Sequence, residues 1–420
     1  MRYEARGPAV SVSTLAHPFR LMLPPQSYPE CSLESMHFTS ISASCDARHL
    51  SNQRRGGVRR YLLVQQVKKN SPARATGLQC RLRAVLGNMH SESGVRHAES
   101  VAEPPFPGMV WIPGGTFRMG SDKHYPEERP SHRVTVDGFW IDRSPVTNEQ
   151  FARFVLATGH VTFAEIPPNP ADYPGALPHM LFAGSLVFTK PSGPVDRRDF
   201  HNWWSFMRGA DWRHPYGPDS TNAGLEDHPV VHISFADAEA FARWQGKALP
   251  TEAEWEFAAR GGLDDAPYAW GKDFLPADRH MANTWQGDFP WENLAADGYE
   301  RTSPVGAFPP NGYGLYDMVG NVWEWTADWY VPKHPAEAIK ACCVPRNPRG
   351  PKADDSYDPC QPEIKIPRKV IKGGSHLCAP NYCRRYRPAA RFPEPVDTST
   401  CHLGFRCIVR PPSGASCETS

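Results

Sequence analysis

The feature that most constrains the fold of this chain is its proline content, because proline interrupts both kinds of regular element. The chain has 44 prolines among 420 residues, about twice the average usage. Each proline lacks a backbone N–H donor and has a fixed φ, so helix interiors and central strands exclude it. We therefore expect an irregular α+β fold with few helices, short strands and many loops.

The charge balance argues against binding driven by bulk electrostatics. Lys plus Arg total 46 and Asp plus Glu total 45, so no net field attracts nucleic acid or an anionic membrane. No apolar run approaches the roughly 20 residues of a membrane helix. The first thirty residues also lack the apolar segment of a signal peptide. We expect a cytoplasmic protein that binds neither nucleic acid nor membranes.

The chain divides into three parts by its degree of organisation. Residues 1–104 show little hydrophobic periodicity, and we interpret them as an N-terminal extension that is disordered or belongs to a misassigned start. Organised patterning begins abruptly at Met109. We predict one domain over residues 105–412 and a short tail over 413–420.

Capping signals predict three helices. A capping box at Thr147 opens the first helix, and Gly159 ends it. Ser234 caps a second helix that runs to about Gln245. A second capping box, at Thr251, opens the third helix, which ends at Gly261-Gly262.

Short alternating or apolar runs predict the strands. Two apolar runs flank a Pro-Gly-Gly turn within residues 109–120, which indicates a β-hairpin. Further strands are expected at 133–136, 139–141 and 230–233. Residues 163–227 are predicted to be mostly loop, and their tryptophans favour an ordered loop.

Two of the eleven cysteines are candidates for chemistry. Cys378 and Cys383 lie five residues apart, after Gly373-Gly374 and before three arginines. The adjacent glycines allow a close approach of backbone. Neighbouring guanidinium groups favour the thiolate, and two close thiolates suit copper(I). A structural disulfide or two buried apolar thiols are the alternatives. A zinc site would need four ligands, which His376 and His402 could complete.

Eight segments then carry the motifs of one family: residues 109–120, 133–148, 212–215, 228–230, 249–255, 312–325, 372–387 and 403–407. Over residues 107–410 the chain resembles formylglycine-generating enzyme, the sulfatase-modifying factor family. The resemblance implies a C-type-lectin-like fold and a monomer. It also implies an oxidase that uses dioxygen, copper(I) and a thiol reductant. Its substrate would be the cysteine of a Cys-x-Pro-x-Arg motif in an unfolded sulfatase, which becomes Cα-formylglycine.

The resemblance also assigns roles to single residues. The catalytic residues would be Cys378 and Cys383, both copper ligands, with Ser375 and Trp323, and the substrate-binding residues would be Tyr382 and Arg384. Without the resemblance, Trp323 would be interpreted as core and Arg384 as a surface or ion-paired residue.

Two windows are implied to bind structural calcium. The first consists of Asn283, Thr284, Asp297 and Tyr299, and the second of Asp317, Gly320, Val322 and Glu324. Both offer side-chain and backbone oxygens, which suit a hard cation. Neither has the spacing of an EF-hand.

The chain departs from the disulfide pattern of secreted animal members of the family. Ala242, Ala259 and Pro388 stand at three of the four cysteine positions, and Cys407 stands alone at the fourth. This pattern favours a reducing compartment.

Two other functions stay open at this point. An iron-dependent sulfoxide synthase of the same superfamily would need a histidine–carboxylate triad, for which residues 1–104 offer only His90 and His97. A non-catalytic lectin-like binding module would not need Cys378 and Cys383, because a fold does not fix a function.

Overall fold

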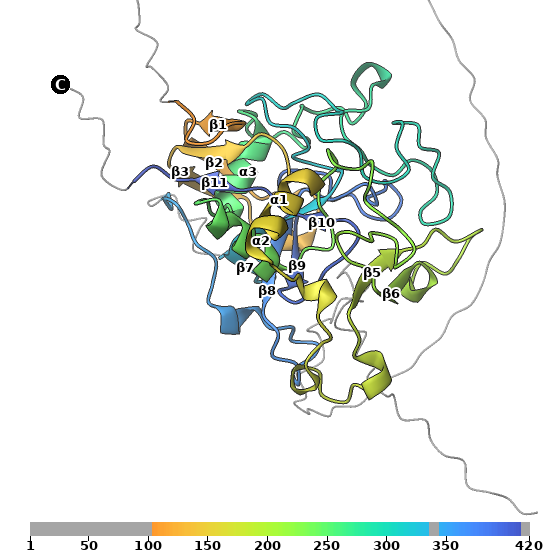
Figure 1. Ribbon diagram of the computed structural model, residues 1–420. Coiled ribbons are helices and arrows are strands. Elements are labelled where there is room, and N and C mark those ends of the chain that lie inside the picture. The colour runs from red at the N-terminus through yellow and green to blue at the C-terminus, as the bar shows by residue number, and fades with distance from the viewer. Residues whose placement is uncertain (1–102, 336–343, 413–420) are drawn as a thin grey trace, which may run out of the picture. The chain divides into compact units, whose positions relative to one another are not determined.

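The strands of the largest sheet come both before and after the cysteine pair in the sequence. The computed structural model describes residues 103–335 and 344–412 (Figure 1). The strand order in this sheet is β10-β7-β8-β9, comprising β7 (Trp323–Trp329), β8 (Arg368–Lys372), β9 (Arg391–Pro395) and β10 (Leu403–Gly404). The β7, β8 and β9 strands are antiparallel, and β10 joins β7 in parallel.

Three smaller sheets complete the strands. They comprise β1 (Met109–Ile112) with β4 (Phe139–Asp142) and β11 (Ile408–Val409), β2 (Gly115–Met119) with β3 (His132–Val136), and β5 (Gly184–Phe188) with β6 (Trp204–Arg208). The predicted strands at 133–136 and 139–141 are confirmed as β3 and β4.

The predicted hairpin over residues 109–120 is wrong. Both of its strands form, but β1 pairs with β4 and β2 pairs with β3. Gly114 has φ of +71°, and a Cβ there would lie 2.6 Å from the carbonyl oxygen of Val136. The Gly-Gly turn therefore packs against the β3–β4 connection instead of closing a hairpin.

All three predicted helices are confirmed. They are α1 (Asn148–Thr158), α2 (Phe235–Trp244) and α3 (Glu252–Arg260), and each begins with a complete capping box. Gly159 and Gly261 end α1 and α3 in the left-handed conformation, at φ of +67° and +58°. These caps satisfy backbone groups that a helix end leaves unpaired.

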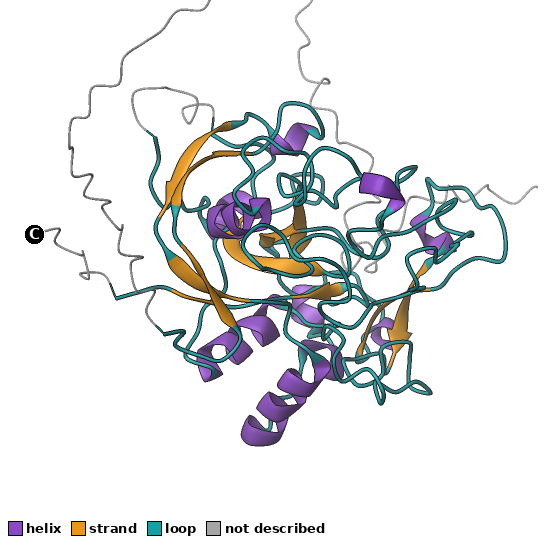
Figure 2. Cartoon of the chain, turned by 90° about the horizontal axis from the view of Figure 1, so that it is seen from above, coloured by secondary structure: helices purple, strands orange, loops and turns teal. Residues whose placement is uncertain are grey.

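Loops and turns account for most of the remaining described chain (Figure 2). Short 3-10 turns interrupt them: η3 (Pro126–Glu128), η4 (Phe163–Glu165), η5 (Pro170–Asp172), η6 (Pro178–Met180), η7 (Phe200–Asn202), η8 (Pro276–Asp278) and η10 (Ala353–Ser356). Four of these seven turns start at proline, where its fixed φ and missing N–H are tolerated. The few helices, short strands and many loops confirm the predicted fold class.

Two local predictions need correction. Residues 230–233 do not form a strand, because His232 adopts a left-handed φ of +62° that breaks the extended run. Its backbone N–H instead donates to Thr400. Within residues 163–227, predicted to be mostly loop, the β5–β6 hairpin forms and positions Trp203 and Trp204 in the core.

Two hydrophobic clusters meet at the cysteine segment. The larger cluster packs α1, α2 and α3 against the main sheet and includes Cys378 and Cys383. The smaller one gathers aromatic side chains around Trp285 and includes Leu377 and Ala379. The residues around the first cysteine thus alternate between two cores, which fixes the segment from both sides.

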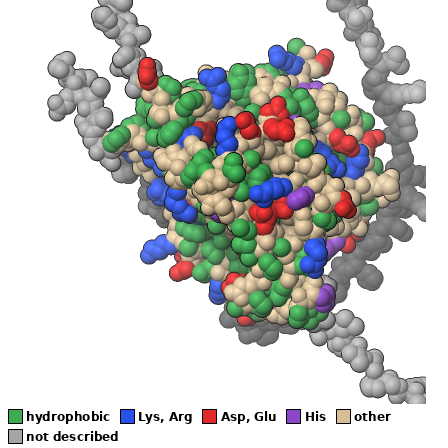
Figure 3. Space-filling view, in the orientation of Figure 1, with side chains coloured by type: hydrophobic (Ala, Val, Ile, Leu, Met, Phe, Trp, Pro, Cys, Tyr) green, Lys and Arg blue, Asp and Glu red, His purple; other side chains and the backbone are tan. Residues whose placement is uncertain are grey.

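The surface carries mixed charge. On the face shown in Figure 3, basic and acidic side chains are interspersed with apolar ones. Among the described helices, none combines the length and apolar character that a membrane span requires. The predicted extension over 1–104, apart from its last two residues, and the predicted tail over 413–420 lie outside the described residues.

Candidate active site

The cysteine pair lies in the connection between two neighbouring strands. β8 ends at Lys372 and β9 begins at Arg391, and these two residues are direct partners in the sheet. The chain between them, residues 373–390, forms a loop that we call the cysteine loop. Its entry needs glycine: Gly374 has φ of +69°, and a Cβ there would lie 2.9 Å from the backbone of Arg385 and Tyr386. The expected close approach of backbone at this glycine pair is confirmed.

The two sulfur atoms lie together inside the protein. Cys378 Sγ and Cys383 Sγ are 3.2 Å apart, and both residues are buried, at 0% and 1% exposure. Both are free thiols, since a disulfide would require about 2.05 Å. A short turn closes the pair: the N–H of Cys383 donates to the carbonyl of Ala379 at 2.9 Å. The structure thus excludes a disulfide here, and leaves two close sulfurs.

The surroundings favour one thiolate and one thiol. Burial opposes ionisation of Cys383, but the hydrogen bond from the Cys378 thiol and the charge of Arg385 outweigh it and lower the pKa of Cys383 to about 6. Burial and the neighbouring Cys383 raise the pKa of Cys378 well above its usual value. Near neutral pH, Cys383 is therefore the thiolate and Cys378 keeps its proton.

The cation beside the pair is Arg385. Its Nη1 lies 3.9 Å from Cys383 Sγ, and its Nη2 lies 2.6 Å from Glu127 Oε1. Tyr125, from the segment before η3, covers the guanidinium with its ring. Sequence reasoning missed Glu127 and Tyr125, because they contact the site across 258 or more positions of sequence.

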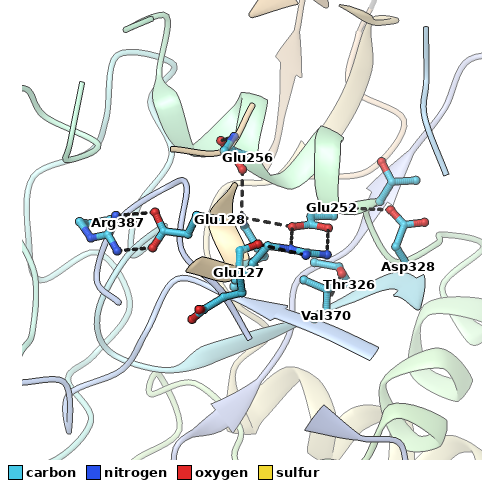
Figure 4. Close-up of polar contacts among 12 residues, drawn as sticks. Glu127, Glu128, Glu252, Glu256, Thr326, Asp328, Val370 and Arg387 are labelled. Carbon is cyan, nitrogen blue, oxygen red and sulfur yellow. Dashed lines mark hydrogen bonds and ion pairs between the residues drawn. The ribbon is translucent and has the colours of Figure 1, made fainter. Parts of the chain in front are cut away.

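Buried ion pairs hold the base of the cysteine loop. Lys372 Nζ lies 3.0 Å from Glu256 of α3, and Arg391 binds Glu252 of the same helix at 2.7 and 3.0 Å. Figure 4 shows these carboxylates of α3 together with Glu128, which binds Arg387. One helix therefore fixes the last residue before the loop and the first residue after it.

The other predicted site residues divide into near and remote. Ser375 is buried, and its backbone N–H lies 3.4 Å from Cys378 Sγ. Tyr382 stacks on Phe289, with ring centroids 4.2 Å apart. Arg384 is exposed, and its backbone N–H donates to the hydroxyl of Tyr125. Trp323 is 1% exposed and belongs to the same core cluster as the two cysteines.

Comparison with known proteins identifies the family. The family model described as "sulfatase-modifying factor enzyme 1-like domain" matches residues 95–411. The chain belongs to this family. The irregular fold of the described residues, with three α-helices and short strands, is the family's fold.

Individual relatives in the family agree over the same region. The formylglycine-generating enzyme of Mycobacterium tuberculosis is 53% identical over 307 residues, covering 73% of this chain and 99% of the relative. The inactive C-alpha-formylglycine-generating enzyme 2 of Bos taurus is 45% identical over 320 residues, covering 72% and 89%. Overall similarity thus links the chain both to relatives named formylglycine-generating enzyme and to relatives whose name calls them inactive, so function has to be argued from the site.

Among solved structures, PvdO from Pseudomonas aeruginosa superposes with a TM-score of 0.48 at 25% identity, covering 72% of this chain and 94% of PvdO.

The first predicted calcium window brings oxygen atoms together. Asp297 accepts the backbone N–H of Thr284 at 3.1 Å and that of Tyr299 at 3.0 Å. Asn283 is 1% exposed, and its Oδ1 has no hydrogen-bond partner. The amide of Gln286 contacts both the Thr284 carbonyl and Asp297. A buried oxygen without a donor is the condition that a bound cation would relieve.

The second predicted window is partly neutralised by the chain itself. Both oxygens of Glu324 accept from Arg406, at 2.7 and 2.8 Å, and one also accepts from Trp255. The Asp317 side chain forms no ion pair with any described residue, and burial raises its pKa to about 6. The Asp317 carboxyl therefore fits a cation better than the Glu324 carboxylate does.

The described residues hold no group of three or more His, Cys, Asp or Glu side chains arranged for a metal. His376 points its Nδ1 at the carbonyl of Asn321, and His402 pairs with Thr400. Within that part of the chain, no four-ligand zinc site forms around the cysteine pair. His90 and His97, the candidates for the histidine–carboxylate iron triad, lie outside the described residues. Two sulfurs alone form the candidate centre.

Proposed function

We propose that the protein oxidises a cysteine of a sulfatase to Cα-formylglycine, with copper(I) held by Cys378 and Cys383. The observation that carries the proposal is the pair of free, buried sulfurs 3.2 Å apart. The family's relatives named formylglycine-generating enzyme support the reaction. A binding module would gain nothing from a thiolate kept beside a buried cation.

The donor set fits copper(I). Thiolates are soft ligands and select this ion over hard cations, and two of them leave coordination positions free for a substrate thiolate. When bound, copper(I) would supply the activation of dioxygen for removal of a hydrogen from the substrate's β-carbon. Overall, the substrate Cβ–S unit gives two electrons, two molecules of a thiol reductant together give two more as they join in a disulfide, and dioxygen becomes two waters. Hydrolysis of the resulting thioaldehyde then yields the aldehyde and sulfide.

The residues of the loop prepare the pair. The Arg385 guanidinium stabilises the Cys383 thiolate, so metal binding displaces one proton, from Cys378. The Ser375 N–H, 3.4 Å from Cys378 Sγ, orients that sulfur and stabilises it once ionised. The Tyr382–Phe289 stack forms an aromatic wall next to Cys383, suited to the proline of a Cys-x-Pro-x-Arg segment.

Calcium would act on the structure. In the first window Asn283 and Asp297 would supply side-chain oxygens, and Thr284 and Tyr299 would supply carbonyls. In the second window Asp317 would lead, with Glu324 and the carbonyls of Gly320 and Val322. Bound cations would brace long loops that few regular elements support. The free thiols of Cys378, Cys383, Cys401 and Cys407 support a reducing, cytoplasmic setting.

One assay tests the proposed function. The full chain loaded with copper(I), given dioxygen, a thiol reductant and a Cys-x-Pro-x-Arg peptide, should produce an aldehyde detected by mass and by hydrazine capture. Cys383→Ser and Cys378→Ser should each abolish the product, whereas Cys401→Ser, which removes another buried thiol, should retain it. Product from both Cys378→Ser and Cys383→Ser would refute the assignment.

A further inference from the structure

The guanidinium of Arg385 faces two negatively charged groups, the Cys383 thiolate and the Glu127 carboxylate, with different edges. Nη1 lies 3.9 Å from Cys383 Sγ, while Nη2 and Nε lie 2.6 and 3.3 Å from Glu127 Oε1. The side chains of Arg385 and Glu127 are only 12% and 14% exposed. Arg385 is therefore shared between a sulfur on one side and a carboxylate on the other, in a poorly solvated setting.

Two aromatic rings hold the guanidinium in this orientation. Its central carbon lies 4.0 Å from the ring centroid of Tyr125 and 4.3 Å from that of Phe392. The Tyr125 hydroxyl also accepts the N–H of Arg384, which ties the ring to the cysteine loop. Cation–ring contacts on a desolvated guanidinium are favourable. Arg385 thus has a fixed position that does not depend on Glu127 alone.

The segment that supplies Glu127 has its own anchor. The next residue, Glu128, is fully buried and binds Arg387 through both carboxylate oxygens, as Figure 4 shows. The carbonyl of Glu128 also accepts the N–H of Ser121 at 3.0 Å. The η3 turn would therefore stay in place if the charge of Glu127 were removed.

The Arg385–Glu127 ion pair affects the charge balance at the two sulfurs. Two thiolates around one cuprous ion carry a net charge of −1, and a substrate thiolate adds another. Such charges inside a protein are unfavourable unless a nearby group compensates them. Arginine is the suitable compensator, because it stays protonated under all ordinary conditions. Glu127 opposes that compensation, because it places a negative charge on the far edge of the same guanidinium.

We propose that Arg385 is the fixed counter-charge of the copper(I) dithiolate and that Glu127 limits its effect, so that this ion pair sets the copper affinity of the site. The inference rests on the proposed function. Both groups are positioning residues, since they act on the metal through Cys383.

The test uses variants that remove one charge at a time from the full chain. Copper(I) affinity is measured without oxygen by competition with a chromophoric copper(I) chelator, and the sulfur-to-copper charge-transfer absorption is recorded. Arg385→Gln should weaken binding by about tenfold or more, and Arg385→Lys should recover most of the loss. Glu127→Gln keeps an oxygen acceptor for Arg385 but no charge, so binding should become about threefold tighter or more.

The opposite signs separate electrostatics from damage to the fold. If Arg385 and Glu127 only hold the loop together, both Gln variants should weaken binding, and that result would overturn the inference. An unchanged affinity in Arg385→Gln would overturn it as well. Arg197→Gln removes an exposed charge that contacts the cysteine loop at the carbonyl of Asn381, and solvent screening should keep its affinity within about twofold of the unmodified protein. Failure of the unmodified protein to bind copper(I) would instead refute the proposed function.

Discussion

The base of the cysteine loop and the first calcium window both contain poorly solvated oxygen atoms, and they differ in what compensates these atoms. At the base, the buried cations Lys372 and Arg391 meet the buried carboxylates of Glu252 and Glu256. In the calcium window, the Asp297 carboxylate receives only N–H donors, and a buried amide oxygen of Asn283 receives none. The chain supplies its own counter-charges in the first region and leaves oxygen atoms for an external one in the second.

The difference follows from what each region has to hold. The cysteine loop must keep two sulfurs 3.2 Å apart, so its ends are fixed by groups that are always present. The calcium window has no regular element between η8 and β7, so a bound ion could order its loops. The N–H of Trp285, which follows Thr284, donates to the carbonyl of Cys378 at 3.1 Å. The loop base should therefore be insensitive to calcium, and the window should respond to it.

The largest effect is expected from breaking the loop base. Lys372→Met leaves Glu252 and Glu256 with one cation fewer in a fully buried position, which should cost about 3–5 kcal/mol of unfolding free energy. Denaturant unfolding measures it. Arg153→Met is the matched control, because it breaks an exposed ion pair with Glu149 on α1; its effect should be negligible. A small loss in Lys372→Met would show that the ion pairs do not hold this base.

A somewhat smaller effect on the free energy of unfolding is expected from lowering the pH, because the buried His232 side chain has no ion-pair partner among the described residues. His232 is 0% exposed, and burial lowers its pKa to about 4. In the unfolded chain it takes up a proton near pH 6.5. Between pH 6.5 and 4 the unfolded state therefore binds more protons, and the stability due to neutral His232 falls by about 3 kcal/mol as the pH drops.

Other groups titrate in the same range, so a comparison of variants is needed. Burial raises the pKa of Asp397 to about 6, and this group adds stability as the pH falls. His232→Asn isolates the histidine: its destabilisation, measured by denaturant unfolding, should shrink from pH 7.5 to pH 5. His179→Asn, an exposed position in η6, should show no such trend. A cost for His232→Asn that is independent of pH would contradict the burial argument.

Calcium should give the smallest of the three effects. At a concentration 100 times the dissociation constant, calcium should stabilise the protein by about 2.7 kcal/mol, and a chelator should reverse it. Asn283→Ala should remove most of the response in thermal unfolding. Asn169→Ala, which caps η5 elsewhere, should keep it. If the response persists in Asn283→Ala, the ion does not bind in the first window.

Local chemistry made much of the fold predictable. The capping boxes at Thr147 and Thr251, the Ser234 cap, and the glycines that end α1 and α3 placed every α-helix of the described residues, because a cap depends on residues a few positions apart. The cysteine pair was predictable for the same reason. Gly374 could be assigned to a close approach because only glycine has no Cβ to clash.

Long-range pairing was not predictable. Nothing near residues 109–120 indicates that β1 pairs with β4, and nothing near Val230 indicates the left-handed turn at His232. Glu127 and Tyr125 reach the site from a segment with no motif of its own. Their role depends on Arg385, which lies 258 positions after Glu127 in the sequence, so only the folded structure could identify them.

The account depends most directly on both sulfurs holding one cuprous ion together. An anaerobic titration of the full chain with copper(I) measures this. We predict one tightly bound equivalent, lost in Cys378→Ser and in Cys383→Ser and kept in Cys401→Ser. Tight binding of the full equivalent by either of the first two variants would contradict the account.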